Sequence, residues 1–346
     1  MSRVVSPRAH LTTSVAAVLL CAIGALVMSG CATARPTAGT AAATPAPAAA
    51  TVPATPAGAA APPTPNPPAA GAAAATSATP PAPPPPRRQI ATSRDGTKIS
   101  YDVEGTGPAL LLVHGGGQTG RSWRERGFVE KLRGQFTVIT MDLRGSGESG
   151  KPATPEGYAL DRVLDDLTAV ADAAKAPRFH LWGFGHGATI GRYLTARSPR
   201  VISSVLMSAN FGPPLEGVVR DAVAGMRAKW LPLVQQQMAG TLKVDTLSNS
   251  DRAGWDAGVA VSALALGALM DYPPLEPAEI KVPTVWVIGA ADTSAMENVK
   301  AYEGKLAGTR VTLKLLSGAS YTDSFGKSEL SLAVALPFLL AAPPTP

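Results

Sequence analysis

The chain has 346 residues, of which 45% are hydrophobic, and a net charge of +6. The basic excess is confined to positions 1–88, because positions 89–346 carry 26 basic and 25 acidic residues. A folded part that is almost neutral excludes a nucleic-acid-binding surface as the reason for the basic composition. Positions 32–86 hold 23 Ala and 16 Pro and cannot bury a core. The predicted folded domain is therefore 89–346.

The N-terminus predicts an export signal over residues 1–30. Arg3 and Arg8 precede an apolar run of 13 residues, 15–27, which is shorter than a membrane span of about 20 residues and typical of a signal peptide. Small residues then lead directly to Cys31, and this segment resembles the bacterial lipobox. The resemblance implies cleavage before Cys31 and acylation of that residue. Secretory cleavage near Ala34, or an uncleaved anchor, are the alternatives.

Residues 31–88 are predicted to form a disordered Ala/Pro-rich linker. A chain of this composition is extended and partly polyproline II, with a reach of roughly 170 Å at ~3.1 Å per residue. Together with a lipidated Cys31 it predicts a protein of the cell envelope, anchored to the outer membrane or the cell surface; a secreted protein is the alternative. The chain's two cysteines, Cys21 and Cys31, both precede the domain, so no disulfide is expected within it.

The domain alternates predicted strands and helices, which favours an α/β fold with a mostly parallel sheet. The predicted strands are 98–103, 109–113, 136–141, 179–182, 201–208, 284–289 and 311–316. The predicted helices are 121–132, 160–174, 188–197 and 330–340. Residues 210–282 interrupt this alternation with helical segments at 215–230, 231–239 and 251–270. An insertion of this size predicts a cap over the C-terminal edge of the sheet, where open α/β sheets bind ligands.

Three glycine-rich segments each follow a predicted strand: 114–117 (HGGG), 141–149 (MDLRGSGES) and 181–188 (LWGFGHGA). Together they resemble the α/β-hydrolase family in its capped form, over about 105–340. The resemblance implies a twisted sheet with helices on both faces and a helical cap. It also implies an oxyanion hole made by the backbone N–H groups of Gly116 and His186.

The nucleophile expected from that resemblance is missing. The family's elbow places a nucleophile, usually Ser, at the position that Gly185 occupies here, and the turn offers no Ser, Cys or Asp instead. Glycine adopts the elbow's unusual backbone angles freely, so this replacement preserves the turn while removing the reactive side chain. His186 as an alternative nucleophile is the weaker interpretation.

The acid is predicted at Asp292, after the strand 284–289, where it could equally cap the next helix. The family's chain order places the catalytic histidine after the acid, but no histidine follows Asp292. Tyr321 stands at about the histidine position, and a phenol with a pKa of about 10 is a poor base at neutral pH. The predicted triad is therefore incomplete at two of its three positions.

The remaining motif residues are expected to be structural. His114 is predicted to shape its loop, Asp142 and Arg144 to form a pair that braces neighbouring loops, and His180 to pack within its strand. Ser146 and Ser149 have no recognisable base. A final group of cap side chains is predicted to pack in a core rather than line a pocket: Met226, Trp230 and Trp255.

These observations predict an exported, membrane-anchored protein without a working covalent triad, which binds a small apolar or acyl ligand or acts as a scaffold. The first alternative is an active hydrolase of esters, lactones or epoxides that uses Asp292 and the oxyanion hole. The second is a structural envelope protein. No metal, cofactor or nucleic acid is expected, because the sequence shows no metal-ligand cluster, phosphate loop or dinucleotide fingerprint.

Overall fold

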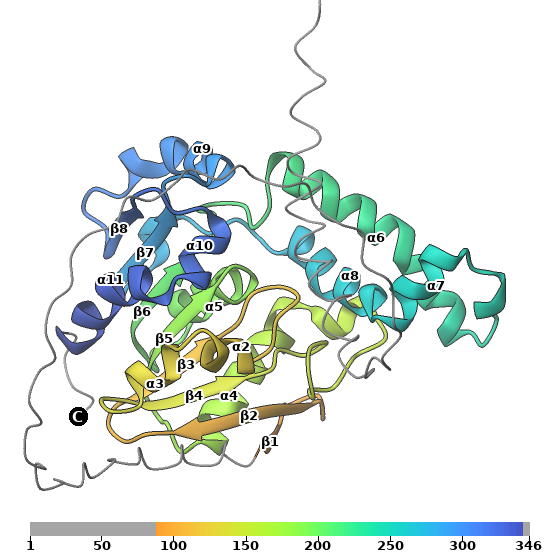
Figure 1. Cartoon of the computed structure of the whole chain (residues 1–346), viewed down its shortest axis with the longest axis horizontal. Helices are drawn as coiled ribbons and strands as arrows, with labels where there is room; N and C mark the ends of the chain where they lie inside the picture. The colour runs from red at the N-terminus through yellow and green to blue at the C-terminus, as the bar shows by residue number, and fades with distance from the viewer. Residues whose placement is uncertain (1–87, 342–346) are drawn as a thin grey trace, which may run out of the picture. The chain divides into compact units, whose positions relative to one another are not determined.

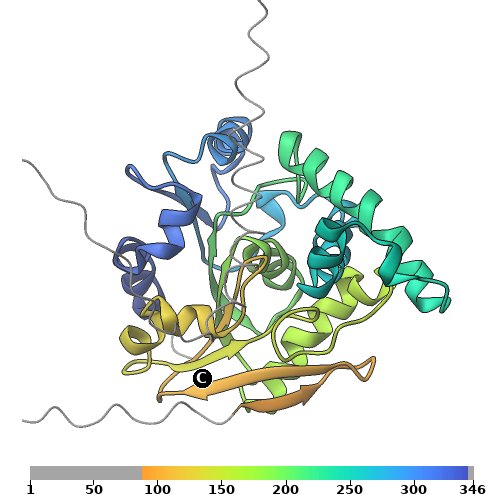
Figure 2. The same cartoon turned by 45° about the vertical axis from the view of Figure 1, so that its right-hand side comes forward.

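The computed structural model describes residues 88–341, and Figures 1 and 2 show their arrangement. The predicted signal peptide, the lipidation site Cys31 and the linker up to Arg87 lie outside the described residues. Arg88, assigned to the linker from sequence, contacts the domain. Its guanidinium lies 2.6 Å from the carboxylate of Asp142 and 3.2 Å from that of Asp102.

The centre of the domain is an eight-stranded sheet with the order β1-β2-β4-β3-β5-β6-β7-β8. Its strands are β1 (Gln89–Thr92), β2 (Lys98–Glu104), β3 (Ala109–Val113), β4 (Thr137–Met141), β5 (Phe179–Phe184), β6 (Val201–Met207), β7 (Thr284–Gly289) and β8 (Val311–Leu316). The β1–β2 and β2–β4 pairs are antiparallel, and every other pair is parallel. The predicted mostly parallel sheet is confirmed, and β1 is an addition to it.

Helices cover both faces of the sheet, as the views in Figures 1 and 2 show. Alternate strand residues divide accordingly: Leu111 and Val113 join one buried cluster, and Leu110 and Leu112 join the other. This division explains the continuous apolar runs of central strands such as β3 and β7, since both of their faces are covered. The edge strands β1 and β8 instead expose several residues. The first cluster includes α4 (Leu160–Ala173), α5 (His186–Arg197) and α9 (Thr293–Tyr302), and the second includes α2 (Arg121–Glu125), α3 (Phe128–Leu132), α10 (Tyr321–Gly326) and α11 (Ser328–Ala341).

Two helical predictions in the body of the domain need correction. The predicted helix 121–132 is two short helices, because Gly127 adopts a left-handed conformation with φ +77° between α2 and α3. Helix α10 was not predicted. It begins at a capping box, in which the Ser320 hydroxyl accepts the N–H of Asp323 and the Asp323 carboxylate accepts the N–H of Ser320.

The cap consists of α6 (Gly217–Met238), α7 (Asn249–Asp256) and α8 (Val259–Ala268). The predicted break near 230 is wrong, because α6 continues through Pro232. The predicted helix 251–270 is divided instead at Gly258, where φ is +76°. Trp230 is buried against Trp255, with ring centroids 6.5 Å apart, which confirms packing rather than pocket lining for these two side chains.

Short 3₁₀ turns connect several of these elements: η2 (Pro155–Tyr158), η3 (Val244–Thr246), η4 (Leu269–Asp271), η5 (Pro277–Glu279) and η6 (Glu303–Lys305). None of the individual helices within 88–341 combines the length and the apolar composition of a membrane span. The pair Asn249–Asp256 and Val259–Asp271, bent by 72°, meets the criterion of length and composition only when counted together.

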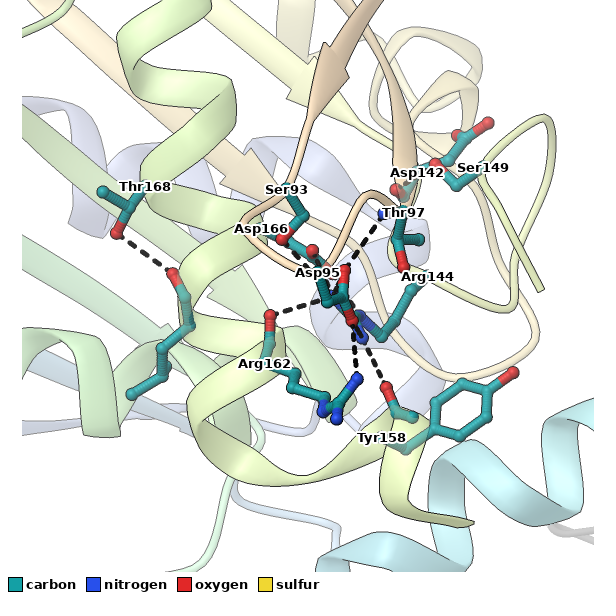
Figure 3. A network of polar contacts seen from close by, with 12 residues as sticks. Ser93, Asp95, Thr97, Asp142, Arg144, Ser149, Tyr158, Arg162, Asp166 and Thr168 are labelled. Carbon is teal, nitrogen blue, oxygen red and sulfur yellow. Dashed lines mark hydrogen bonds and ion pairs between the residues drawn. The ribbon is translucent and has the colours of Figure 1, made fainter. Parts of the chain in front are cut away.

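A buried ionic network surrounds Arg144, whose side chain is 1% exposed (Figure 3). Its guanidinium forms ion pairs with Asp166 at 2.6 Å and Asp95 at 2.9 Å, and donates to the Arg162 carbonyl. The network joins the β1–β2 turn, the loop after β4 and helix α4. The predicted pairing of Asp142 with Arg144 is therefore wrong, because each residue braces different segments.

Asp142 instead secures the loops near the C-terminal ends of β3 and β4. Its buried carboxylate accepts the backbone N–H groups of Gly120 and Glu148 at 2.8 and 2.9 Å, in addition to the Arg88 contact. These interactions outweigh the cost of burial and lower the pKa of Asp142. Ser149 is also structural, since its hydroxyl donates to the Asp142 carbonyl.

Candidate active site at the end of strand β5

The predicted site residues meet at the C-terminal edge of the sheet. Gly116 follows β3, Gly185 follows β5, Asp292 follows β7, and Tyr321 follows β8. Parallel strands bring these four loops to the same edge, which explains how positions far apart in the sequence form one site. Gly185 is buried, whereas Gly116, Asp292 and Tyr321 are each partly exposed.

Gly185 forms a sharp turn between β5 and α5. Its backbone has φ +50° and ψ −113°, and its N–H donates to the Met207 carbonyl at 2.8 Å. Glycine is also required two residues later, because a Cβ on Gly187 would lie 2.2 Å from the Val113 carbonyl oxygen. The turn thus has the strand-to-helix geometry of a nucleophile elbow, with no nucleophilic side chain at its centre.

The Tyr321 hydroxyl fills the space in front of Gly185. A Cβ built on Gly185 would lie 2.2 Å from Tyr321 Oη, so the phenol oxygen occupies the region into which a nucleophilic side chain would project. The Tyr321 ring packs against Phe184 with centroids 5.0 Å apart, and Phe184 stacks on Phe325. Among residues 88–341, the hydroxyl has no hydrogen-bond partner.

The phenol is held in its protonated form. Burial raises the pKa of Tyr321 above its ordinary value of 10, and the negative charge of Asp292 raises it further. A phenol with a raised pKa is a poor general base and a poor nucleophile at neutral pH. It remains able to donate a hydrogen bond.

Asp292 is the N-cap of α9, where its carboxylate accepts the Ala295 N–H at 3.1 Å. The helix-capping interpretation is therefore confirmed. The role of catalytic acid stays a prediction that capping does not exclude. Burial raises the pKa of this carboxyl, despite the opposing effect of the backbone N–H groups of Ala295 and Ser294.

The predicted oxyanion donors lie next to each other. A Cβ on Gly116 would lie 3.9 Å from the His186 Cβ and 3.3 Å from a methyl group of Leu266 in α8, so the cap contacts this loop. In the part of the chain that the structure describes, the backbone N–H groups of Gly116 and His186 donate to no other group. The geometry is compatible with an oxyanion hole, and that role stays a prediction.

His114 shapes the loop that carries Gly116. Its Nε2 accepts the backbone N–H of Leu143 at 3.0 Å, and its Nδ1 lies 2.7 Å from the Gly115 carbonyl oxygen. This pattern assigns the proton to Nδ1 of a neutral ring. The predicted structural role of His114 is confirmed, as is the packed position of His180, which is buried in β5.

His186 gives the site a pH-dependent contribution to stability. Its pKa is lowered from 6.5 to about 3, because burial disfavours the charged ring and His114 adds to the effect. The folded state therefore binds fewer protons than the unfolded chain between these values, so stability is complete above pH 6.5 and falls as the pH is lowered.

We expect urea unfolding of the wild type between pH 7 and pH 4 to include a slope of up to ~1.4 kcal/mol per pH unit from His186. The His186→Gln variant, which cannot acquire this proton, is expected to show a shallower decline. If the free energy of unfolding changes with pH to the same extent in both proteins, the pKa of His186 is the same in the folded and the unfolded state.

Ser208, which directly follows β6, is a residue that no sequence pattern singled out. Its φ of +58° is unusual for a residue with a side chain. Its buried hydroxyl has no partner among the described residues, while its N–H donates to the Val287 carbonyl. A serine at the end of a strand is unremarkable in sequence, so only the backbone geometry reveals it.

One small cavity is lined in part by His186, the residue after the elbow glycine. It is also lined by Tyr272 and Ala265, among others, and has a volume of about 10 Å³, close to the lower limit for one water molecule. A larger groove of about 370 Å³ lies elsewhere, between Tyr193 of α5 and the segment 273–281. Within 88–341, no group of three or more His, Cys, Asp or Glu residues is arranged to hold a metal ion.

Comparisons with known proteins agree with this geometry. The family model described as alpha/beta hydrolase fold matches residues 108–251. An uncharacterized protein of Mycobacterium tuberculosis is 30% identical over 174 residues, which are 50% of this chain and 48% of that protein. Epoxide hydrolase 3 of Siraitia grosvenorii is 32% identical over 125 residues, or 36% of this chain and 39% of that enzyme. The chain thus spans about half or less of the length of these relatives.

Solved structures share the fold over a longer region. A structure from a study of epoxide hydrolases in metagenomes from hot environments is 19% identical, with a TM-score of 0.57, and the match covers 73% of this chain and 98% of that one. The Bottromycin epimerase BotH, in complex with Bottromycin A2, is 24% identical with a TM-score of 0.54, covering 73% and 99%. At these identities, the likeness shows the fold alone.

Proposed function

We propose, from the premise that the chain belongs to the α/β-hydrolase family, that this member binds a small molecule at its elbow without forming a covalent intermediate with it. The proposal rests on one observation: Gly185 offers no nucleophile, and the Tyr321 hydroxyl lies 2.2 Å from where the Cβ of one would stand. Removing triad members of a serine hydrolase leaves only ~10³–10⁴-fold acceleration over water. Binding is then the function for which the retained loops are still suited.

The same proposal includes attachment to a membrane. The signal-like segment 1–30 and the small residues before Cys31 support lipidation of that cysteine, and the Ala/Pro-rich linker supports a domain held at a distance from the bilayer. A comparison of membrane association between the wild type and a Cys31→Ser variant tests this part independently of the elbow. We expect the variant to lose membrane association. A secreted, unlipidated protein is the competing outcome.

Hydrolysis by a diverged mechanism is the second candidate. It is favoured by the position of Asp292 after β7 and by the raised pKa of its carboxyl, which moves toward the range useful for a general base. The names of the epoxide hydrolase relatives also support it. In this mechanism, Asp292 would remove a proton from water while the backbone donors stabilise the developing oxyanion.

Ester hydrolysis distinguishes the two candidates. We expect the wild-type chain to hydrolyse p-nitrophenyl butyrate at the background rate, and the Gly185→Ser/Tyr321→His variant to gain activity. The double change supplies a nucleophile and a base, and it also removes the Tyr321 hydroxyl that the new side chain would meet. The assay compares initial rates per mole of folded protein.

The single variants are the matched controls. Gly185→Ser alone places its Cβ against Tyr321 Oη, and Tyr321→His alone lacks a nucleophile, so neither is expected to gain activity. Wild-type turnover that is abolished by Asp292→Asn, a change that retains a good helix cap, would overturn the non-hydrolysing proposal in favour of the second candidate.

A further inference from the structure

We infer that Arg88 is a clasp, through which the N-terminal segment of the chain controls two loops of the candidate site. While its guanidinium is in place, the loops 114–120 and 143–149 are fastened to each other, and its withdrawal frees them. The first loop follows β3 and carries Gly116, and the second follows β4. The inference goes beyond the proposed function, because the clasp acts on these loops whether the site binds its ligand or hydrolyses it.

Arg88 lies among three carboxylates that come from separate parts of the chain. Its guanidinium is 2.6 Å from Asp142, 3.2 Å from Asp102 in β2 and 3.7 Å from Glu148. The Arg88 side chain is 15% exposed, and that of Asp142 is fully buried. Among residues 88–341, no other cation lies within ion-pair distance of Asp102 or Asp142. Arg88 therefore neutralises two carboxylates that have no second cationic partner in this part of the chain.

The Asp142 carboxylate transmits the position of Arg88 to both loops. Its Oδ1 accepts the backbone N–H of Gly120 at 2.8 Å, at the end of the first loop. Its Oδ2 accepts the backbone N–H of Glu148 at 2.9 Å, in the second loop, and also the Arg88 guanidinium. The second loop fits closely around this carboxylate, because a Cβ on Gly147 would overlap Oδ2. A displaced or protonated Asp142 therefore loosens both loops together.

Loss of the Arg88 guanidinium would leave Asp142 as a buried charge without a cation. A buried charge of this kind is costly, and the negative charge of Asp102 lies on the same side of the sheet edge and repels it. The folded chain can relieve this cost by letting water reach Asp142 or by protonating it. Either change weakens the bonds from Gly120 and Glu148, since a dry, ionised carboxylate is the stronger acceptor.

The clasp is placed where it can open without unfolding the sheet. Arg88 is the first described residue, and it precedes β1, a strand of four residues at the edge of the sheet. The clasp is also incompletely bonded: Arg88 Nε and Asp102 Oδ1 are buried and have no hydrogen-bond partner among residues 88–341. An event that removes Arg88 from this position, such as a cut in the chain directly after it, would free the two loops and leave the central strands paired.

Amide hydrogen exchange of the full chain, resolved by NMR, tests the clasp. In Arg88→Met, which keeps an unbranched side chain, we expect the Gly120 and Glu148 amides to exchange about tenfold faster than in the wild type, as for loss of hydrogen bonds to a charged group. Low concentrations of urea should hardly change these rates, because a local opening exposes little surface. The amides of β7 should respond strongly to urea, since they exchange only when the sheet unfolds.

Two further variants show whether the charge of Arg88 is responsible. Arg88→Lys retains a charge but not the planar fork, so its exchange rates should lie between those of the wild type and Arg88→Met. Arg121→Met is the matched control, because Arg121 pairs with the same loop at Glu148, at 2.7 Å, with a side chain that is 59% exposed. An exposed pair contributes little, so this variant should exchange like the wild type.

Contrary results in the exchange rates would overturn the clasp. Wild-type rates at Gly120 and Glu148 in folded Arg88→Met would do so. Faster exchange that shares the urea dependence of the β7 amides would also do so, because it would show a loss of global stability alone. Equal effects of Arg88→Met and Arg121→Met, or exchange in Arg88→Lys as fast as in Arg88→Met, would show that the buried charge does not hold the loops. The proposed function stands or falls separately, by the ester assay.

Discussion

Replacing Arg144 by alanine is expected to lower the free energy of unfolding by about 3–5 kcal/mol, as measured when one partner of a buried ion pair is removed. Arg144 and Asp166 have side chains that are 1% and 0% exposed, so the variant leaves the Asp166 carboxylate buried without its cation. The carbonyl groups of Gly157 and Arg162 lose their donor at the same time (Figure 3). Urea unfolding at neutral pH measures the loss.

Arg162→Ala is the matched control. Arg162 also pairs with Asp95, at 3.2 Å, but its side chain is 49% exposed. Exposed pairs contribute at most about 1 kcal/mol, so this variant should remain close to the wild type. A loss below about 1 kcal/mol for Arg144→Ala would mean that water reaches and solvates Asp166 in the variant, and that the network is not buried in solution.

A paired substitution separates the cost of an unpaired charge from the net contribution of the network. Arg144→Met combined with Asp166→Leu removes both charges together, and replacing a buried pair by apolar residues is often neutral or stabilising. We expect the double variant to be more stable than Arg144→Ala. It should not fully recover, because the Gly157 and Arg162 carbonyls still lack a donor.

The predictability of this fold from sequence follows from where its strands lie. Strands such as β3 and β7 are covered on both faces, so they appear as continuous apolar runs, and their predicted bounds match the structure. Helix α10 lacks such a run, since its sequence is YTDSFG, and it was missed. In the cap, the predicted break near Trp230 was wrong because the helix continues through Pro232.

The candidate site was predictable in part, for a related reason. Motif order alone predicts that Gly185 and Tyr321 occupy the nucleophile and histidine positions, and the structure places both at one edge of the sheet. The contact between them depends on where α10 directs the Tyr321 side chain, which no local pattern in the sequence specifies. Arg88 was likewise assigned to the linker, because its role depends on the buried carboxylate of Asp142, 54 positions further along the chain.

The contact between Gly185 and Tyr321 makes a second large effect testable without any ligand. Gly185→Ala is expected to lower the free energy of unfolding by about 2–5 kcal/mol. Part of the loss is the cost of a side chain at φ +50°, ~1–2 kcal/mol, and part is overpacking against Tyr321 Oη, ~1–3 kcal/mol. Chemical denaturation of purified variants provides the measurement.

A double-mutant cycle isolates the contribution of the contact. In Gly185→Ala/Tyr321→Phe the hydroxyl is gone, and the nearest remaining atom of that ring, Cζ, lies 3.3 Å from the new Cβ. We expect the double variant to recover the overpacking part and keep the backbone cost, which gives a coupling of about 1–3 kcal/mol. Additive losses would place Tyr321 away from the elbow in solution and would remove the main support for a filled nucleophile position.

Gly225→Ala provides the matched control for replacing glycine itself. Gly225 lies inside α6 and a Cβ there would meet no atom within 4 Å. Alanine is favoured over glycine in a helix by about 1 kcal/mol, so this variant should be slightly more stable than the wild type. Opposite signs at two glycines would show that the penalty at Gly185 arises from its backbone angles and from the Tyr321 hydroxyl. The glycine at the elbow and the position of Tyr321 would then be energetically coupled, because a side chain at position 185 and the Tyr321 hydroxyl compete for the same space.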